Sequence, residues 1–589
     1  MRFLCLATDY DGTLAHDGVA DKETWEAVRR FRESGRKVVL VSGRDLDELG
    51  EIASPLDRFD GVVAENGGVL YWPASGDRRL LAPPPPPELI DALHDRGVDH
   101  FGVSSTLVAT VKPYETIALQ AIRDLGLELK LAFNKNAVMI MSPAVTKATG
   151  LHAALAELRL SPHNVVGIGD AENDHDFLDV CECAVAVANA LPMLKKRSDF
   201  VTAGDHGRGV TELVDEVLAD DLRSREPALQ RRHILLGKRS GRRSAKDEAV
   251  RLPPYGARAM VAGPSGGGKS TVTTGLLERL ATNGYQFCVF DPEGDYDEFD
   301  DAIVLGGAEH APSHDEVLQL LAQPDQNVVV NLLRVSLADR PLFCAGLLPR
   351  LQRMRVETGR PHWLVFDEAH HLFPARWESA ETSLPQQLET ALLVTVHPKE
   401  VSPAVLRHLN LLLAVGAAPD ETIAEFARSL NRPLPRDIPP ALAKGEAVVW
   451  RPELDDRPPL TVWLPTNRTE RRRHSRKYAE GLLIPERSFY FRGPEGRLNL
   501  RAYNLILFLH LAAGVDDETW LHHLRRHEYS QWFGEVIGDD ELAGEARRAE
   551  ADAELSADES REHIRAAVAR RYTLPENPSL PKIAPPVSR

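Results

Sequence analysis

Two carboxylates stand two residues apart near the start of the chain, in the run Asp9-Tyr10-Asp11-Gly12-Thr13-Leu14. The apolar run at 3–7 predicts a strand that ends just before them, and open α/β sheets bind ligands beyond the carboxyl ends of their strands. At such an edge one carboxylate can attack an electrophile while the other delivers a proton. Because an Asp-x-Asp pair alone is common in solvated turns, the chemistry depends on the residues at the ends of the neighbouring strands.

Later strand ends carry residues suited to phosphoryl transfer. The run at 37–41 leads into Ser42-Gly43-Arg44, which offers a hydroxyl and turn amides to a phosphoryl oxygen. Lys147 comes next, followed by the acidic run Gly169-Asp170-Ala171-Glu172-Asn173-Asp174, the kind of hard oxygen cluster that holds Mg²⁺. A carboxylate that attacks a dianionic phosphoester needs such a cation and such donors to offset the repulsion.

This order of groups resembles the haloacid dehalogenase superfamily of phosphotransferases. The match extends over about residues 1–220. Three finer features look like the Cof-type, sugar-phosphate phosphatase branch: Asn66-Gly67-Gly68, Gly169-Asp170-x-x-Asn173-Asp174 and Ala186-Val187-Ala188-Asn189-Ala190.

The resemblance assigns a role to each matched residue. It implies that Asp9 is the nucleophile and that Asp11 is the general acid and then the general base. Ser42 and Lys147 would hold the phosphate and neutralise charge. The implied Mg²⁺ ligands, with Asn173 in support, are Asp9, Asp170, Asp174 and the main-chain carbonyl of Asp11.

The first 222 residues alternate short apolar runs with segments of helical period. This alternation predicts a parallel sheet covered on both faces, in keeping with the Rossmann-like fold of the superfamily. The 105 residues between Ser42 and Lys147 are too many for one crossover. We therefore expect an inserted α+β cap at about 84–141, which would exclude water and choose the substrate.

A second phosphate motif follows the apolar run at 259–262 and precedes a helix-forming segment that extends to 280. It fits strand, G-x-x-x-x-G-K-S, helix, in which main-chain amides curl around phosphates. Lys269 would reach the β and γ phosphates of ATP, and the Ser270 hydroxyl would bind Mg²⁺. The predicted nucleotide-binding residues in this motif are Gly263, Ser265, Gly266, Gly267, Gly268, Lys269, Ser270 and Thr271.

The apolar run at 362–366 ends in Asp367-Glu368. Asp367 would assist the Mg²⁺, and Glu368 would polarise the attacking water, which favours ATP hydrolysis over transfer to another substrate. With these motifs, residues 233–467 resemble the HerA/FtsK-type translocase ATPases. His397 takes the position of their polar sensor, which is usually Gln, and this departure leaves γ-phosphate sensing open.

The ATPase resemblance also implies a hexameric ring. In such rings the neighbouring subunit supplies an arginine, and Arg407 and Arg432 both remain candidates.

The rest of the chain carries no recognised chemistry. We expect a basic linker at 223–232, a mostly helical domain at 468–573 and a disordered Pro-rich tail at 574–589. Basic stretches at 223–251 and 468–477 are interpreted as solvated linkers, although a grip on nucleic acid phosphates remains open. The aromatic and histidine side chains of 520–532 are expected to form core.

The composition limits the possible partners and location. Acidic residues exceed basic ones by 87 to 70, a formal charge of -17, so the whole protein should not act as a polyanion-binding surface. Its five cysteines do not form a disulfide framework and are expected to be buried thiols. Apolar stretches are shorter than the ~18 residues needed to span a bilayer, so we expect a cytoplasmic protein without a membrane anchor.

We therefore predict a multidomain α/β enzyme, an Mg²⁺-dependent phosphatase of small phosphorylated metabolites such as sugar phosphates, fused to an ATP-hydrolysing domain. A second hypothesis is a nucleic-acid-translocating ATPase with an accessory phosphatase that processes nucleotides or ends. A third is a polynucleotide kinase and phosphatase. The Asp367-Glu368 pair weakens the third, as does the expected cap, which would obstruct a polymer.

Overall fold

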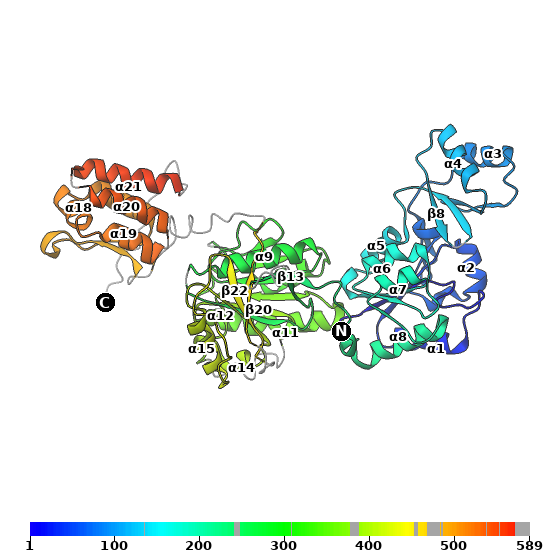
Figure 1. Cartoon of the computed structure of the whole chain (residues 1–589), viewed down its shortest axis with the longest axis horizontal. Helices are drawn as coiled ribbons and strands as arrows, with labels where there is room; N and C mark the ends of the chain where they lie inside the picture. The colour runs from blue at the N-terminus through cyan, green and yellow to red at the C-terminus, as the bar shows by residue number, and fades with distance from the viewer. Residues whose placement is uncertain are drawn as a thin grey trace. The chain divides into compact units, whose positions relative to one another are not determined.

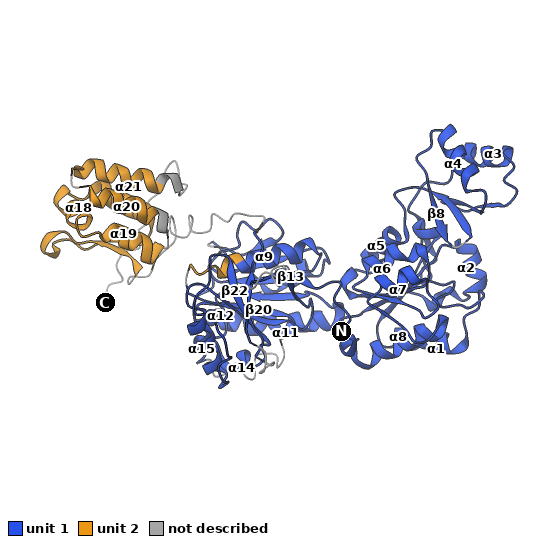
Figure 2. Ribbon diagram, viewed as in Figure 1, with its two compact units in different colours: residues 1–264, 272–466 blue, residues 265–271, 467–589 orange. Residues whose placement is uncertain are grey.

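The computed structural model describes residues 1–134, 136–240, 248–264, 266–307, 309–376, 388–452, 458–467, 483, 487–537, 539–552 and 554–571. Figure 2 shows two compact units, one of residues 1–264 and 272–466 and the other of residues 265–271 and 467–589. Ser265 of the predicted nucleotide loop, the basic run at 468–477 and the predicted tail at 574–589 lie outside the described residues.

The first part of the larger unit is built on a sheet with the order β12-β11-β10-β1-β2-β3-β4-β5 among the residues described. The strands from β12 to β3 are parallel, and β4 and β5 are added as an antiparallel hairpin. This arrangement confirms the Rossmann-like α/β prediction for the N-terminal region. The strands are β1 (Cys5–Thr8), β2 (Lys37–Val41), β3 (Gly61–Ala64), β4 (Val69–Trp72), β5 (Asp77–Leu80), β10 (Val165–Gly169), β11 (Cys183–Ala186) and β12 (Phe200–Val201).

Helices cover both faces of this sheet. Helix α1 (Lys22–Glu33) packs beside α8 (His206–Asp220), whereas α5 (Lys147–Glu157) packs beside α6 (His175–Val180) on the other face (Figure 1). In α1 the side chains of Thr24, Ala27, Val28 and Phe31 are buried, a helical spacing of three and four residues that forms one apolar stripe. The Asp21 side chain accepts a hydrogen bond from the Thr24 amide and caps this helix at its start. Two shorter helices are α2 (Leu46–Ile52) and α7 (Pro192–Arg197).

The segment between β5 and α5 forms a small α+β layer beside the main sheet. Its strands are antiparallel in the order β6-β7-β9-β8. Its elements are α3 (Pro87–Asp95), β6 (Phe101–Val103), β7 (Leu107–Val111), α4 (Glu115–Asp124), β8 (Lys130–Asn134) and β9 (Ala137–Met141). We refer to this segment as the cap.

The second part of the larger unit contains a sheet with the order β14-β13-β23-β22-β21-β15-β20-β19-β16-β18-β17 in the described ranges. The strands from β21 to β17 are parallel, and those from β22 to β14 are antiparallel additions. The parallel strands are β15 (Arg258–Ala262), β16 (Phe287–Asp291), β17 (Ile303–Leu305), β18 (Val328–Asn331), β19 (Trp363–Phe366), β20 (Ala391–Thr395) and β21 (Leu411–Val415). The antiparallel strands are β13 (Ile234–Arg239), β14 (Ala249–Leu252), β22 (Glu446–Trp450) and β23 (Leu460–Trp463).

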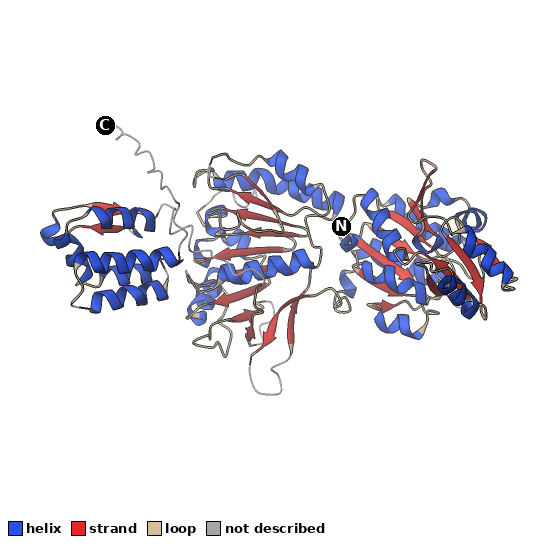
Figure 3. Ribbon diagram, turned by 90° about the horizontal axis from the view of Figure 1, so that it is seen from above, coloured by secondary structure: helices blue, strands red, loops and turns tan. Residues whose placement is uncertain are grey.

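Both faces of this second sheet are buried, as parallel sheets require. In β15, Met260 and Ala262 join one apolar cluster, whereas Ala259 and Val261 join another on the opposite face. Helix α11 (Arg340–Thr358) contributes to the first cluster and α9 (Lys269–Thr282) to the second, so helices lie on either side of the strands (Figure 3). Shorter helices follow other strands: α10 (His314–Leu321), α12 (Ala369–Leu372), α14 (Pro403–Leu406) and α15 (Pro419–Ser429).

The second unit contains a hairpin and a group of helices. Its apolar cluster includes Phe508, Trp520, Tyr529 and Phe533, all fully buried. The core predicted at 520–532 is therefore confirmed for the aromatic residues but wrong for His527, whose side chain is 61% exposed. The elements are β24 (Phe489–Phe491), β25 (Leu500–Ala502), α17 (Leu505–Gly514), α18 (Asp517–Leu524), α19 (Glu528–Trp532), α20 (Asp540–Ala551) and α21 (Ala557–Arg571).

The segment 223–232 differs from the solvated linker expected for it. Leu229 is buried in the apolar core of the first sheet, and Arg231 donates a hydrogen bond to the Cys181 carbonyl at 2.7 Å. Arg231 also forms an ion pair with Asp199 at 3.4 Å. A helix leaves unsatisfied carbonyls and a partial negative charge at its end, so this arginine is drawn to the end of α6 rather than to water.

The described residues also answer two questions that the sequence raised, on membrane-spanning helices and on the cysteines. None of their helices is both long and apolar enough to cross a membrane. All five cysteines are buried free thiols, as expected from the sequence.

Candidate functional site

Three carboxylates meet at the carboxyl edge of the first sheet. Asp9 follows β1, Asp170 follows the neighbouring parallel strand β10, and Asp174 ends the short helix η4 (Glu172–Asp174). One oxygen from each side chain lies within 4.8 Å of the others, and all three residues are at most 5% exposed. A buried set of hard carboxylate oxygens suits a divalent cation such as Mg²⁺.

Lys147 joins two of these carboxylates. It is the first residue of α5, which the Thr146 side chain caps, and its Nζ lies 2.6 Å from Asp9 Oδ1 and 2.6 Å from Asp174 Oδ1. Burial acts to lower the pKa of Lys147, but the charges of Asp174 and Asp9 outweigh it and raise that pKa. The ammonium group is therefore held charged at the place where a phosphoryl group bound to Asp9 would need a cation.

Asp9 lies in the opposite electrostatic situation. Burial, and next the charge of Asp174, raise the pKa of Asp9, while Lys147 acts to lower it. One ammonium group does not balance three carboxylates in a buried site. This excess of negative charge would favour the binding of a further cation.

The main chain holds the cluster in place. Asp174 Oδ2 accepts hydrogen bonds from the amides of Asp170 and Ala171, each at 2.9 Å. Gly12 has φ of +85°, and a Cβ there would collide with the Asp170 carboxylate. At this position glycine permits both the turn and the close approach of the Asp170 carboxylate.

Asp11 lies at the rim of the site and is paired with Arg44. Arg44 Nε donates to Asp11 Oδ2 at 2.5 Å, and its terminal NH2 donates to Oδ1 at 2.9 Å. Ser42 follows β2, is 1% exposed and accepts a hydrogen bond from the Arg44 amide at 3.2 Å. Sequence reasoning gave Arg44 no role of its own, although its place two residues after Ser42 is the signal that puts it at this edge.

Three asparagines support the same edge. Asn173 Nδ2 donates to Asn66 Oδ1 at 3.2 Å, which ties η4 to the turn after β3. Asn189 Nδ2 donates to the Gly12 carbonyl at 2.8 Å, and Asn189 Oδ1 accepts from the His206 amide. The finer sequence features at 66–68 and 186–190 thus lie around the carboxylates. The sequence alone predicted no contact for Asn66 or Asn189.

The predicted nucleotide-binding residues follow neighbouring strands of the second sheet. Gly263 follows β15, His397 follows β20 two residues after its end, and Asp367 follows β19. Because β15, β20 and β19 are adjacent and parallel, these residues leave the same edge of the sheet. Gly263 also lies so close to the Val415 carbonyl that a Cβ would collide with it.

The described part of the nucleotide loop has the backbone that its glycines suggest. Gly266 and Gly268 have φ of +77° and +95°, which favour glycine, and Lys269 begins α9. Ser270 and Thr271 lie in the first turn of α9, and Gly267 lies between the two positive-φ glycines. Asn467 Nδ2 donates to the Thr271 carbonyl at 2.8 Å.

Two acidic residues follow neighbouring strands of the second sheet. The Glu368 amide donates to Asp367 Oδ1 at 3.0 Å, and Glu368 has φ of +41°, a sharp turn directly after β19. Asp291, at the end of the adjacent β16, was not assigned a role. Burial, and then the charges of Asp295 and Asp367, raise the pKa of Asp291 to about 8.

The remaining predicted positions are less distinctive. Arg407 and Arg432 are both exposed, which leaves the choice of a ring arginine where the sequence left it. His370 Nδ1 lies 3.1 Å from Thr395 Oγ1, whose oxygen also accepts from the His397 amide. His370 thus contacts the last residue of β20.

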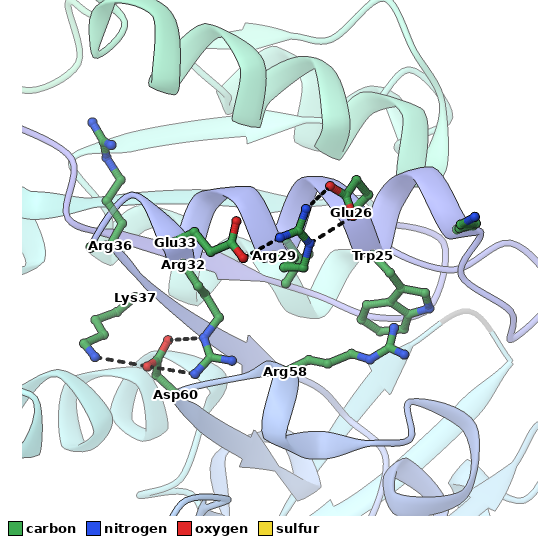
Figure 4. Close-up of a pocket in the computed structure, with 12 residues that line it drawn as sticks. Trp25, Glu26, Arg29, Arg32, Glu33, Arg36, Lys37, Arg58 and Asp60 are labelled. Carbon is green, nitrogen blue, oxygen red and sulfur yellow. Dashed lines mark hydrogen bonds and ion pairs between the residues drawn. The ribbon is translucent and has the colours of Figure 1, made fainter.

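A pocket of about 620 Å³ lies against α1 and the start of β2 (Figure 4). Its charges are largely paired, since Arg29 contacts Glu26 and Glu33, and Arg32 Nε lies 3.0 Å from Asp60. The pocket is lined by Lys37, which begins β2, whereas Ser42 follows the end of that strand. It therefore belongs to the opposite edge of the sheet from the carboxylate cluster.

Comparison with known proteins identifies the first domain. The family model of the haloacid dehalogenase-like hydrolases matches residues 6–108 and 115–214. The phosphoglycolate phosphatase of Methanothermobacter thermautotrophicus is 32% identical over 224 residues, which cover 36% of this chain and 96% of that protein. The chain belongs to the haloacid dehalogenase-like hydrolases.

Other matches to this hydrolase domain have similar extent. The phosphoglycolate phosphatase of Haloarcula marismortui is 31% identical over 222 residues, covering 36% of this chain and 95% of that protein. A haloacid dehalogenase-like hydrolase from Bacteroides thetaiotaomicron, known from its crystal structure, has a TM-score of 0.33 and 18% identity, covering 36% of this chain and 99% of that one.

A second family model, that of the central domain of the helicase HerA, matches residues 258–344. This range begins with β15 and includes the nucleotide loop, α9, β16 and the start of α11. The chain thus joins a haloacid dehalogenase-like phosphatase domain to a HerA-type ATPase domain, and it is a hydrolase.

Proposed function

We propose that the hydrolase domain cleaves small phosphomonoesters through an aspartyl-phosphate intermediate on Asp9, with Mg²⁺ as cofactor. The observation that carries this proposal is the pair of 2.6 Å contacts from Lys147 to Asp9 and Asp174 inside a buried carboxylate cluster. A cluster that served only the fold would bury these charges at high cost. For a nucleophile that meets a phosphate dianion, the same arrangement supplies charge neutralisation.

In the first step a carboxylate oxygen of Asp9 attacks phosphorus, and the bond from phosphorus to the ester oxygen breaks. Asp11, which is one-third exposed at the rim of the site, gives its proton to the departing alkoxide. Lys147 and the Ser42 hydroxyl hold the transferring phosphoryl oxygens. The products of this step are a free alcohol and phosphorylated Asp9.

In the second step Asp11, now a carboxylate, removes a proton from a water molecule that attacks the phosphorus of phospho-Asp9. The acyl phosphate bond breaks, which releases inorganic phosphate and restores the Asp9 carboxylate. Arg44 would orient Asp11 as the carboxylate of the second step, since it donates to both carboxylate oxygens.

The proposed Mg²⁺ ligands are the carboxylates of Asp9, Asp170 and Asp174 and the carbonyl of Asp11. When bound, the ion would offset the negative charge of the phosphoryl group and of these carboxylates. The three buried oxygens within 4.8 Å of one another support this assignment.

The proposed substrate is a small phosphorylated metabolite, with 2-phosphoglycolate first and sugar phosphates second. The relatives named phosphoglycolate phosphatase support the first choice. The cap also favours a short substrate, because β8 packs against η4, the short helix that carries Asp174, and so limits the space beside the carboxylates.

We further propose that the HerA-type domain binds and hydrolyses ATP. Lys269 would bind the β and γ phosphates, Ser270 and Asp367 would hold Mg²⁺, and Glu368 would orient water, while His397 would sense the γ-phosphate. The domain would assemble as a homo-oligomeric ring, with Arg407 or Arg432 serving the neighbouring subunit. The HerA match and the positive-φ glycines of the loop support this proposal.

The HerA match also favours a second function, that of a nucleic-acid-translocating ATPase with an accessory phosphatase. Nucleic acid would then stimulate ATP hydrolysis. Transfer of the γ-phosphate to a hydroxyl would instead indicate a polynucleotide kinase.

One release-of-phosphate experiment separates these functions. Wild type, Asp9→Asn and Lys269→Ala are assayed with 2-phosphoglycolate, sugar phosphates, nucleotides and ATP, with and without DNA. We expect hydrolysis of a small phosphoester that Asp9→Asn abolishes and Lys269→Ala retains. Phosphate released only from ATP, lost in Lys269→Ala and increased by DNA would overturn the metabolite proposal in favour of the motor.

A further inference from the structure

The two faces of the cap sheet have different neighbours. Val108 and Ile140 are paired across β7 and β9, and both join the apolar cluster formed with α3 and α4. The alternate residues Ala109 and Met139 are also paired, and they belong to a separate small cluster. Since side chains alternate along a strand, this second set lies on the face turned away from α3 and α4.

That second face is directed at the catalytic residues. Asn66 Nδ2 lies 3.4 Å from Met141 Sδ. A Cβ on Gly43 would lie 3.9 Å from Met139 Sδ, and Gly43 directly follows Ser42. The group that leaves from a phosphoester at Asp9 therefore faces this side of the cap sheet.

Lys130 belongs to the same face. In β8 it is paired with Met141, and Ala132 is paired with Met139. Among the described residues of β7, β8 and β9, the other members of this face are uncharged: Leu107, Ala109, Val111, Ala132, Asn134, Ala137, Met139 and Met141. An otherwise uncharged surface thus carries one ammonium group.

The surroundings of Lys130 leave this charge incompletely balanced. Its Nζ donates to the Pro143 carbonyl at 3.3 Å, in the loop just before Lys147. Burial lowers the pKa of Lys130, and the carboxylate of Asp176, in the first turn of α6, acts in the opposite direction. A partly desolvated ammonium group is stabilised by an anion that docks beside it.

We propose that Lys130 binds the carboxylate of the substrate and thereby selects phosphate esters of short hydroxy acids over neutral phosphate esters. The proposal rests on the phosphatase function proposed above. Lys130 acts on the leaving group, away from the phosphoryl group, so it determines specificity and takes no part in bond cleavage.

The test compares two substrates of similar length, 2-phosphoglycolate and 2-hydroxyethyl phosphate, which differ in carrying a carboxylate or a neutral hydroxyl. Variants are Lys130→Met and, as a matched control, Lys112→Met, because Lys112 is a cap lysine whose Nζ lies 5.7 Å from the Phe133 ring centroid instead. We expect Lys130→Met to lower kcat/KM for 2-phosphoglycolate about 10- to 100-fold, mainly through KM, the range of one charge-assisted hydrogen bond. For 2-hydroxyethyl phosphate the change should stay below about twofold.

Equal losses for both substrates, or no loss for 2-phosphoglycolate, would overturn the role of Lys130. Calorimetric binding of 2-phosphoglycolate to the Asp9→Asn protein, with and without Lys130→Met, gives a readout that does not depend on turnover. If wild type hydrolyses neither ester, the phosphatase proposal fails. The binding measurement then still decides whether Lys130 recognises the carboxylate.

A second inference comes from a buried polar seam between the hydrolase and ATPase domains. Glu182 is its centre: one carboxylate oxygen lies 3.0 Å from the Arg2 guanidinium, and the other accepts from Tyr285 OH at 2.8 Å and lies 2.7 Å from His163 Nδ1. Tyr255 OH donates to the His163 carbonyl at 2.7 Å. Tyr255 and Tyr285 belong to the ATPase domain, and the other three residues to the hydrolase domain.

The ring of His163 contacts a residue of its own domain through one nitrogen and a residue of the ATPase domain through the other. Its Nδ1 faces the Glu182 carboxylate, and its Nε2 lies 2.6 Å from the Asn283 carbonyl. Both ring nitrogens thus face oxygen atoms, and the ring stacks on Tyr285 with centroids 3.7 Å apart. The seam is satisfied only when both domains are present.

The seam lies between the ends of two functional elements. Asn283 follows directly after α9, the helix that Lys269 begins. His163 lies two residues before β10, the strand that leads to Asp170. A shift of α9 on nucleotide binding would therefore act on the strand that carries the proposed metal ligands.

We infer that nucleotide binding at Lys269 and substrate binding at Asp9 are energetically coupled through His163 and Glu182. This inference rests on the ATP binding proposed above. Coupling of this kind is reciprocal, so each ligand must change the affinity for the other by the same factor, about fivefold or more for a typical coupling.

The full chain with Asp9→Asn and Glu368→Gln, which should bind both ligands without turnover, is titrated with fluorescent ATP and with 2-phosphoglycolate, each alone and with the other saturating. We expect each ligand to change the affinity for the other by the same factor. This coupling should be lost in His163→Gln and reduced in the milder variant Tyr285→Phe. A coupling factor of one while both ligands bind, or one that persists in both seam variants, would overturn the inference. Failure to bind ATP would overturn it together with the ATPase proposal.

Discussion

Arg44 holds the Asp11 carboxylate through two hydrogen bonds, at 2.5 Å and 2.9 Å, at the rim of the carboxylate cluster. A planar guanidinium matches both oxygens of a carboxylate at once. The proposed general acid is thus oriented by a residue of the loop after β2, while the proposed nucleophile is held by Lys147 from α5.

Replacing Arg44 tests this orientation. We expect Arg44→Ala to lower kcat about tenfold, the size expected for one lost charge-assisted contact, and Arg44→Lys to restore it incompletely because an ammonium group does not bind both oxygens. Glu48→Ala is the matched control, since Glu48 lies 3.4 Å from Arg44 on its other side. Steady-state phosphate release measures kcat for these variants. A larger loss of kcat for Glu48→Ala than for Arg44→Ala would contradict the role of Arg44 in orienting Asp11.

Lys147→Met keeps the length of the side chain and removes its charge. Because the Asp9 and Asp174 carboxylates then lose their shared cation, we expect turnover to fall by about 10² or more and the protein to lose thermal stability in EDTA. Added Mg²⁺ should raise the melting temperature of Lys147→Met more than that of wild type, as the ion relieves the repulsion. If Mg²⁺ raises the melting temperatures of the two proteins equally, then Lys147 and the ion do not neutralise the same carboxylates.

Two glycines in one loop separate backbone strain from loss of the metal site. Gly12 and Gly18 have similar φ, +85° and +80°, but a Cβ meets Asp170 at Gly12 and nothing within 4 Å at Gly18. We expect Gly18→Ala to cost about 1 kcal/mol in the free energy of unfolding and to leave activity unchanged. Gly12→Ala should cost more and raise the Mg²⁺ concentration needed for half-maximal activity at least tenfold, and equal Mg²⁺ requirements would contradict this prediction.

Acid should weaken the interdomain seam. Burial acts to raise the pKa of Glu182, but the hydrogen bonds and charges of His163 and Arg2 lower it to about 2. A carboxyl group with a lowered pKa stabilises the fold above its ordinary value of 4.5, and this stabilisation is lost as pH falls from there toward about 2.

Glu182→Gln should therefore cost on the order of 3 kcal/mol in the free energy of unfolding at pH 7. The difference in the free energy of unfolding between wild type and Glu182→Gln should become smaller below pH 4.5. Urea unfolding at several pH values measures this difference. Glu157→Gln is the control, because Glu157 is half-exposed in a surface ion pair with Arg79 and such pairs contribute little. If the loss of stability in Glu182→Gln stays constant from pH 7 to pH 3, the charge of Glu182 does not stabilise the seam and the prediction is wrong.

The sequence by itself was enough to predict the two α/β regions and their chemistry. Apolar runs followed by Asp9, Ser42, Asp170, Gly263 and Asp367 indicate strand ends, and parallel strands bring their carboxyl ends to one edge regardless of distant details. Local patterns of this kind depend on neighbours within a few residues, so they can be recognised without a structure. The matches to the hydrolase and HerA families confirm the recognition.

Contacts between distant residues were decided only by tertiary structure. The pairing of Arg44 with Asp11, the direction of Lys130 toward the site and the seam around Glu182 join segments separated by 33 to more than 100 residues. The basic segment at 223–232 was misjudged for the same reason, since its charge pattern suits a solvated linker equally well. Arg231 finds its hydrogen-bond partners at the end of α6, where it donates to the Cys181 carbonyl 50 residues earlier in the chain. A local sequence pattern cannot predict a contact between segments so far apart.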